Sequence, residues 1–352
     1  MSSQSAQEGN GGGQPDELPS GPPYVSQFAQ HGGIPTVTVD VPICAVLLAC
    51  FLAGAILNMT IWKRNGRRGH KFHLSAVVFY FCFARMVACI LRIVWATRPD
   101  NVRISIAAGI LFNAGVLILF VTNLIFLQRL IRAHHPRFGW SKTLGWVFYF
   151  LYFGIFACFV MVVYAVVSSC FTLDRSMQSK FADIRRTSAI YMAFLASLPL
   201  PATLLLLVWP RKNAVDKFGQ GSMTAKVVIL LITTSLLATG AIFRASIGFM
   251  PRPIEDPGWF NHRAAYYLFN YFIELVVVYT LALNRMDKRF YVPDSAKKPG
   301  DYSKCATTAD RNSLDDEADL NDGKAPTPGE ERRLENEWEM SLQREMEHKQ
   351  AP

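Results

Sequence analysis

Four ionisable side chains lie within long apolar stretches of the sequence, where a charge needs a partner or a function. They are Arg85, Arg92, Arg244 and Glu274. A charged side chain at the centre of a bilayer costs about 2.5–3.5 kcal/mol on insertion scales. Arginines and carboxylates at such positions pair with each other, bind an ionic ligand or transfer protons. These four residues are therefore the first candidates for a functional site.

Residue counting along the apolar stretches predicts two levels of charge. Arg85 and Glu274 fall near the middle of the membrane, and we expect them to form a buried ion pair. Arg92 follows Arg85 by two helical turns on the same face, so it lies roughly 10 Å nearer the outer surface, at the level of Arg244. Further polar residues share the helical face of Glu274 or the outer level: Tyr267, Asn270, Tyr271 and Asn113.

These eight residues are the predicted ligand-binding site, and two interpretations of them stay open. In the functional interpretation they line a polar cavity that opens to the outside. Its arginines then bind an anionic head group or carboxylate, and Glu274 acts as a counter-ion or proton acceptor. In the structural interpretation the Arg85–Glu274 pair holds two helices together, and the two outer arginines extend to the membrane interface.

Seven apolar segments must position these side chains, and each is long enough to cross a bilayer, which takes about 20 mostly apolar residues. Charged residues make up 18% of the chain, below the roughly 25% of soluble domains, and they concentrate outside the segments. The sequence therefore predicts an all-α bundle of seven transmembrane helices over residues 41–285. The expected spans are 42–62, 73–97, 104–131, 143–169, 187–209, 224–249 and 264–284, with Pro199 and Pro201 interrupting the fifth. Stripes of small residues, such as Ala45, Ala49 and Ala53, are expected to let helices approach closely inside the bundle.

The regions on either side of the bundle have the composition of disordered tails. Residues 1–40 are rich in Gly and Pro and contain no Lys or Arg, so they predict a disordered extracellular tail and no cleavable signal peptide. Residues 286–352 predict a mostly disordered cytoplasmic tail with a short helix at 331–348. Leu334, Trp338, Leu342 and Met346 form an apolar stripe on that helix. Either a cytoplasmic partner protein binds this stripe, or the helix stays solvated.

The distribution of Lys and Arg predicts the orientation of the helices. The first, third and fifth loops and the residues after the last helix are basic. Because basic loops stay in the cytoplasm, we expect the N-terminus outside or in a lumen and the C-terminus in the cytoplasm, at a plasma membrane or endomembrane. The fourth loop is the exception, since it holds Arg175, Lys180, Arg185 and Arg186.

Several kinds of chemistry lack the residues that they need. The chain has no G-x-x-x-x-G-K-[ST] phosphate loop and no G-x-S-x-G nucleophile elbow, and its seven histidines are scattered. The net charge of +9 does not indicate nucleic acid, because no soluble basic stripe with interleaved aromatic residues occurs. We therefore expect no enzyme, no metal or other cofactor, and no nucleic-acid partner. Cys44 and Cys170 fall near the outer face, and a disulfide between them stays an open alternative.

Three stretches carry a family resemblance. They are Gln-Arg-Leu-Ile-Arg-Ala-His-His-Pro at 128–136, Phe243-Arg244, and the region from Tyr267 through Glu274 to Arg-Met-Asp-Lys-Arg-Phe-Tyr-Val-Pro at 285–293. On these the chain resembles a family of uncharacterised fungal seven-helix membrane proteins, over about residues 40–293. In layout it is also similar to fungal lipid-translocating exporters, whose late helices likewise carry Arg and Glu. The closer family implies no catalytic residues.

The leading hypothesis is a multi-pass membrane protein that handles or translocates a small amphipathic or anionic molecule, or a lipid, without catalysis. The charged residues in the apolar segments support it, because they could bind a head group. The competing hypothesis is a seven-helix sensor or receptor that signals through its cytoplasmic tail. A structural protein that organises a membrane region through that tail is the third.

Overall fold

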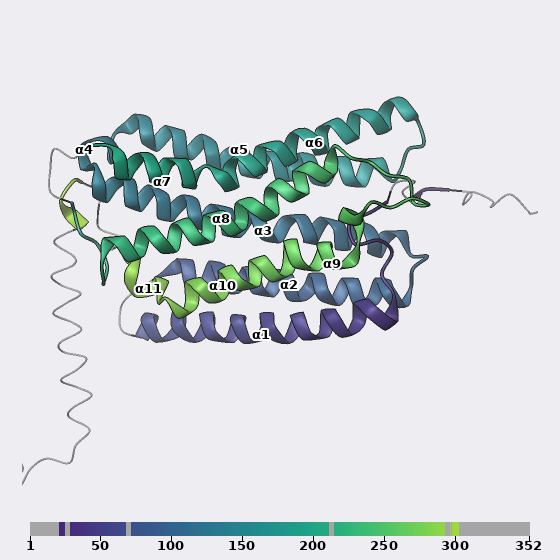
Figure 1. Cartoon of the computed structure of the whole chain (residues 1–352), viewed down its shortest axis with the longest axis horizontal. Coiled ribbons are helices and arrows are strands. Elements are labelled where there is room, and N and C mark those ends of the chain that lie inside the picture. Colours follow the sequence, from purple (N-terminus) through teal and green to yellow (C-terminus); the bar gives the residue numbers. More distant parts are fainter. Residues whose placement is uncertain are drawn as a thin grey trace, which may run out of the picture.

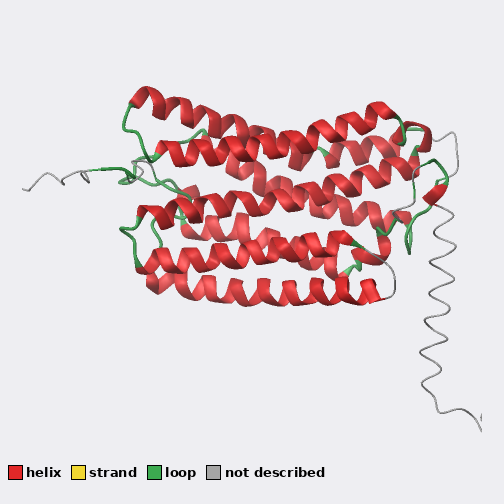
Figure 2. Cartoon of the chain, turned by 180° about the vertical axis from the view of Figure 1, so that it is seen from behind, coloured by secondary structure: helices red, strands yellow, loops and turns green. Residues whose placement is uncertain are grey.

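The computed structural model describes residues 21–24, 29–67, 72–210, 215–292, 296 and 298–302 of the chain. Within these residues the fold is a bundle of helices without a β-strand, as the sequence predicted. The long helices lie side by side along one axis, and the connecting loops gather at the two ends of the bundle (Figures 1 and 2). We call the end at which the first helix begins the N-terminal end, on the right in Figure 1, and the opposite one the C-terminal end.

Seven helical spans are long and apolar enough to cross a membrane, which confirms the predicted bundle. The first four are α1 (Val37–Arg67), α2 (His73–Thr97), α3 (Val102–His134) and α5 (Lys142–Ser169). The fifth consists of α6 (Arg175–Ser197) and α7 (Pro199–Val208), and the sixth is α8 (Met223–Gly248). The seventh joins α9 (Arg263–Tyr266), the π-helix η2 (Tyr267–Phe272) and α10 (Ile273–Leu283). Short elements connect them: α4 (Pro136–Gly139), η1 (Trp259–Asn261) and α11 (Met286–Arg289).

The outer surface of the bundle is apolar along the spans. On α5 the aromatic side chains of Trp146, Phe150, Phe153 and Phe156 are all exposed. Contiguous apolar patches of this kind are rare on soluble monomers but are what a helix presents to lipid. The chain is therefore a multi-helix membrane protein.

The fifth span begins earlier and breaks where the sequence predicted an interruption. Asp174 caps the start of α6 by accepting a hydrogen bond from the Ser176 amide, so this helix begins twelve residues before the expected residue 187. The first turns of α6 are polar, and a search for apolar stretches overlooks them. At the other end Pro199 has no amide hydrogen to continue α6, and the chain restarts as α7 with Pro199 in its first turn.

One expected packing stripe faces outward. Ala45, Ala49 and Ala53 are exposed on α1, so they do not let a neighbouring helix approach inside the bundle. The buried face of α1 is the adjacent one, with Phe51 and Gly54, and Gly54 packs near Val278 of α10 and Cys82 of α2. The prediction was wrong because a stripe of small residues does not by itself show whether it faces a neighbouring helix or the outer surface.

The described residues extend into both predicted tails. Residues 29–36 pack over the N-terminal end of the bundle, and α1 already begins at Val37. At the C-terminal end α11 follows the last span, and Tyr302 is buried against Trp140 and Phe218. The expected helix at 331–348 lies outside the described residues.

Candidate functional site

The predicted ion pair between Arg85 and Glu274 forms in the interior of the bundle. Arg85 on α2 donates from Nε and Nη2 to the two carboxylate oxygens of Glu274 on α10, at 2.5 and 2.6 Å. Its third contact is the Phe112 carbonyl of α3, 2.9 Å from Nη1. Both side chains are almost completely buried. Gly115 makes room for the guanidinium, because a Cβ there would lie 3.3 Å from it.

Arg244 approaches the same carboxylate but does not hydrogen-bond to it. Its Nη1 lies 3.8 Å from Oε1 of Glu274, beyond hydrogen-bond range. That nitrogen is buried and has no hydrogen-bond partner within the described residues. The sequence placed Arg244 at the level of Arg92, whereas the structure brings it to Glu274. Two guanidiniums thus share one carboxylate, which leaves one positive charge uncompensated in this cluster.

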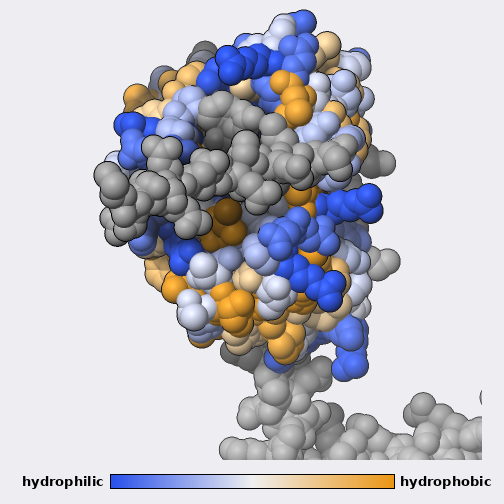
Figure 3. All heavy atoms as spheres, turned by 90° about the vertical axis from the view of Figure 1, so that its right-hand side faces the viewer, coloured by the Kyte–Doolittle hydropathy of each residue, from blue (hydrophilic) through white to orange (hydrophobic). Residues whose placement is uncertain are grey.

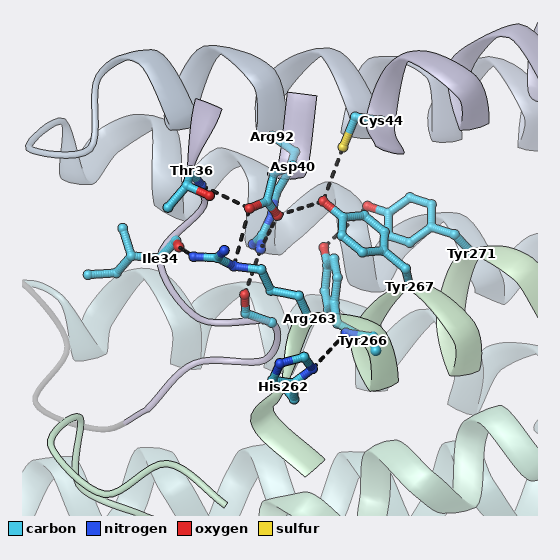
Figure 4. Close-up of polar contacts among 12 residues, drawn as sticks. Ile34, Thr36, Asp40, Cys44, Arg92, His262, Arg263, Tyr266, Tyr267 and Tyr271 are labelled. Atoms are coloured by element: carbon cyan, nitrogen blue, oxygen red, sulfur yellow. Dashed lines mark hydrogen bonds and ion pairs between the residues drawn. The ribbon is translucent and has the colours of Figure 1, made fainter. Parts of the chain in front are cut away.

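Arg92 belongs to a second cluster, centred on Asp40, which the sequence analysis missed. Asp40 is fully buried in the first turn of α1 and forms ion pairs with Arg92 at 3.0 Å and Arg263 at 3.3 Å. The Tyr267 hydroxyl donates to Asp40 at 2.7 Å and the Thr36 amide at 2.8 Å (Figure 4). Again one carboxylate faces two guanidiniums. The only signal in the sequence was an acid directly before an apolar segment.

Three tyrosines of the seventh span lie close to these clusters: Tyr267 and Tyr271 are in the π-helix η2, and Tyr266 directly precedes it. Their hydroxyls form three contacts: that of Tyr267 contacts Asp40 and the Cys44 thiol, and that of Tyr271 lies 3.3 Å from that of Tyr266. Wider turns of this kind are frequent at functional sites. Asn270 donates to the Tyr266 carbonyl, so it serves the helix itself and does not point to a ligand.

The segment from residue 29 to residue 36 is held over the N-terminal end of the bundle by several contacts. Arg92 donates to the Gly32 carbonyl at 2.8 Å, and Arg263 donates to the Ile34 carbonyl at 3.2 Å. Gly32 has φ +73°, and a Cβ there would lie 2.7 Å from the Tyr266 ring, so both its backbone and its lack of a side chain are required. We call residues 29–36 the N-terminal segment.

His31 is the titratable residue of the N-terminal segment. Burial and, secondarily, the nearby Arg244 charge lower its pKa from 6.5 to about 4. Its Nδ1 is buried without a hydrogen-bond partner in the described part of the chain, and its ring lies 6.4 Å from that of Phe112. At neutral pH the imidazole is therefore uncharged.

We expect acid to loosen the N-terminal segment through His31. A released segment binds a proton with the ordinary pKa of 6.5, whereas the seated one binds it only near pH 4, so the released state carries more protons between these values. The His31 contribution to stability is thus complete above pH 6.5 and is lost progressively as the pH falls toward 4. Thermal unfolding of the purified protein across this range should show a fall that His31→Gln lacks. Parallel pH profiles for the two proteins would contradict this expectation.

A cavity of about 1390 Å³ lies beneath the N-terminal segment. This exceeds the roughly 300–1,000 Å³ of ordinary small-molecule pockets, so it has room for a long molecule. It extends from the loops at the N-terminal end to Phe120, near the middle of α3. Its deeper walls are apolar and come from α3, α5 and α6: Val116, Leu117, Phe120, Phe159, Val162, Ala189 and Met192.

The charged residues on the cavity wall are all of one sign. No Asp or Glu lines it within the described residues, whereas six arginines do: Arg92, Arg175, Arg185, Arg186, Arg244 and Arg263. Figure 3 views this end of the molecule and shows hydrophilic side chains around a recess in which a hydrophobic surface is visible. Such a combination suits a ligand with an anionic head and an apolar tail.

The cavity divides the eight predicted site residues into two groups. Arg92, Arg244 and Asn113 line it, and the Asn113 amide donates to the Gly109 carbonyl of its own helix. The other five lie behind the wall: Arg85, Tyr267, Asn270, Tyr271 and Glu274. These five support the site from behind and do not face a ligand. Ser105 and Gly109, which lie on α3 with Asn113, also line the cavity.

The structure also shows where the basic residues of the fourth loop lie and whether the alternative disulfide forms. The basic residues of the fourth loop are on α6, and Arg175, Arg185 and Arg186 line the cavity. Arg186 donates to the Gly248 carbonyl at the end of α8. The alternative disulfide does not form: Cys44 and Cys170 are both free thiols.

A protein-family model described as a protein of unknown function, DUF3112, matches residues 210–291. The match covers α8, η1 and the whole seventh span, and it therefore includes Arg244, Arg263 and Glu274. Searches of the curated proteins and of the solved structures find no match.

Proposed function

We propose that this protein binds a small anionic amphiphile in the cavity between α3, α5, α6 and α8 and handles it within the membrane without converting it. The observation that carries the proposal is the lining itself. Six arginines line a cavity whose deeper walls are apolar, and no acid does so in the part of the chain that the structure describes. A positively charged cleft with low-dielectric walls concentrates anions. The layout resemblance to fungal lipid-translocating exporters points in the same direction.

The cavity also suggests how such handling begins. Below Phe120, Asn123 of α3 forms hydrogen bonds of 3.2 and 3.3 Å with Thr233 and Thr234 of α8. These three side chains are buried, and they join α3 to α8 beneath the cavity. An amphiphile would therefore enter from the N-terminal end and stop near the middle of the bundle. Translocation would require α3 and α8 to separate at this layer.

We infer that the N-terminal end faces the outside or a lumen. The orientation rule had one exception, the basic fourth loop, and the cavity gives its arginines a different role. Arg175, Arg185 and Arg186 attract the ligand and are not signals of topology. The remaining loops follow the rule, with basic loops in the cytoplasm.

The proposal is tested by filling the cavity. Ala189 lies on its apolar wall, and Ala189→Trp should lower the affinity of the protein in nanodiscs for a fluorescent long-chain fatty acid by about 10-fold or more, because the indole occupies the space of the alkyl chain. Ala45→Trp, on the exposed face of α1, is the matched control and should bind as the wild type does.

Proteoliposomes then separate binding from translocation, since only a translocator moves the bound fatty acid from the outer to the inner leaflet faster than protein-free vesicles do. A folded wild-type protein that binds none of the amphiphiles would overturn the proposal. Equal affinity of Ala189→Trp and wild type would place the binding outside the cavity.

A further inference from the structure

Arg244 has a donor that the protein leaves unused. Both carboxylate oxygens of Glu274 accept short hydrogen bonds from Arg85, so Arg244 remains at 3.8 Å from the nearer one. A buried, charged donor without a hydrogen bond is costly, typically by more than a neutral one. Arg244 lines the cavity, and its side chain is 12% exposed. Glu274 is already shared with Arg85, so an anion that balances the Arg244 charge can be supplied from the cavity.

His31 and Arg244 both lie near the Phe112 ring. The Arg244 guanidinium is 5.9 Å from the centre of the Phe112 ring, and the His31 ring lies 6.4 Å from it. His31 lines the cavity as well, and its Nδ1 is, like the Arg244 Nη1, a buried nitrogen without a hydrogen-bond partner within the described residues. An arginine fork and a neutral imidazole near one aromatic ring can bind the two oxygens of an acid group.

We propose that Arg244 and His31 form a subsite for a head group with a single negative charge shared by two oxygens, as in a carboxylate or a phosphodiester. This inference rests on the proposed function of the cavity and specifies which amphiphile it accepts. It concerns the head group alone, whereas cavity binding as such depends on the apolar walls.

The charge of the cluster favours a monoanion over a dianion. Arg85, Arg244 and Glu274 together retain one positive charge, and all three are largely buried. A monoanion neutralises the cluster, whereas a dianion would leave a negative charge in a poorly solvated place. Arg186 of α6 binds the Gly248 carbonyl, about one helical turn beyond Arg244, and is therefore not a member of this cluster.

The position of the subsite also leaves room in the cavity for the apolar chain of the ligand. Phe112 lies beside the subsite, and Phe120 marks the deep end of the cavity. These residues are eight apart on α3, so the apolar part continues for roughly 12 Å beyond the head group at 1.5 Å per residue. Val116 and Val162 line that part. A single alkyl chain fits there.

The experiment compares amphiphiles that differ only in the head. The full-length protein in phosphatidylcholine nanodiscs at pH 8 is titrated with a long-chain fatty acid and with the alcohol, the alkyl phosphate and the alkyl methyl phosphodiester of the same chain length. We expect the fatty acid, the phosphodiester or both to bind about 10- to 100-fold more tightly than the alcohol, as charge-assisted hydrogen bonds imply. The dianionic alkyl phosphate should bind no more tightly than the monoanions.

Variants assign the preference to the subsite. Arg244→Gln should remove the preference for the monoanions and leave the affinity for the alcohol unchanged, and Arg244→Lys should retain part of it. His31→Gln should weaken monoanion binding several-fold and serves as the second test if the Arg244 variants do not fold. Arg252→Gln is the matched control, because Arg252 is an exposed arginine at the same end that does not line the cavity.

Each outcome decides one claim. Equal affinity for the fatty acid and the alcohol overturns the head-group subsite and leaves the cavity as the binding site. Tightest binding of the alkyl phosphate, or a monoanion preference that survives both Arg244→Gln and His31→Gln, also overturns the subsite. If no amphiphile binds to the folded protein, the proposed function itself fails.

Discussion

Glu274→Gln should destabilise the bundle by about 3–5 kcal/mol, which is the usual cost of breaking a buried ion pair by removing one partner. Glutamine keeps the shape of the side chain but removes the negative charge between Arg85 and Arg244. Both guanidiniums then remain buried without a counter-ion. The change should appear as a large fall in the midpoint of thermal unfolding of the purified protein. Size-exclusion chromatography is used to follow this unfolding.

Two companion variants give this result its meaning. Glu255→Gln removes an exposed acid at the N-terminal end and should unfold as the wild type does. Adding Arg85→Met to Glu274→Gln should restore part of the stability, because the buried cation that lost its partner is also removed. If Glu274→Gln alone unfolds at the wild-type temperature, the carboxylate does not hold the three helices together.

Asp40→Asn should release the N-terminal segment from the bundle. Arg92 and Arg263 bind the Gly32 and Ile34 carbonyls of the segment, and Asp40 is the carboxylate that pairs with both arginines. Asparagine cannot neutralise them. Hydrogen bonds to charged groups contribute about 1.5–3 kcal/mol each, so the seated state should lose most of its preference. The cavity beneath would become more accessible.

Cys170 provides a reporter for this release. It is a free, half-buried thiol that lines the cavity, and its carbonyl accepts a hydrogen bond from the Tyr24 amide. At a fixed pH and in a Cys305→Ser background, Asp40→Asn should raise the rate of maleimide labelling at Cys170 by about 10-fold or more. Asp100→Asn, an exposed acid at the same end, should leave the rate unchanged. Equal rates in all three proteins would mean that Asp40 does not hold the segment.

The two carboxylate clusters share a design that bears on function. In each, one buried carboxylate faces two arginines. Arg244 of the Glu274 pair lines the cavity, and so do both arginines of the Asp40 pair, Arg92 and Arg263. The carboxylates hold the arginines in place, and the remaining positive charge is available to a ligand. The supporting residues therefore contribute to stability, whereas the cavity-lining ones determine what binds.

The seven spans and their helical nature follow from the sequence alone, because a bilayer leaves a chain few choices. About 20 apolar residues must satisfy every backbone hydrogen bond within their own segment, so the length and composition of each segment determine both its structure and its place. The Arg85–Glu274 pair was predictable for a related reason. Burying two opposite charges at the same depth of the membrane costs much less free energy when they form a pair than when they are separate.

The site, in contrast, depends on how the helices are rotated and packed, which hydropathy does not record. Only the tertiary structure shows that Arg244 approaches Glu274, and that Asp40 is the partner of Arg92. Asp40 was assigned to a tail because it precedes the apolar segment. The polar first turns of α6 were not included in the fifth span, because they too precede an apolar segment. The cavity lies between α3, α5, α6 and α8 beneath the N-terminal segment. Its arginines come from four distant parts of the chain, and only packing brings them to one wall.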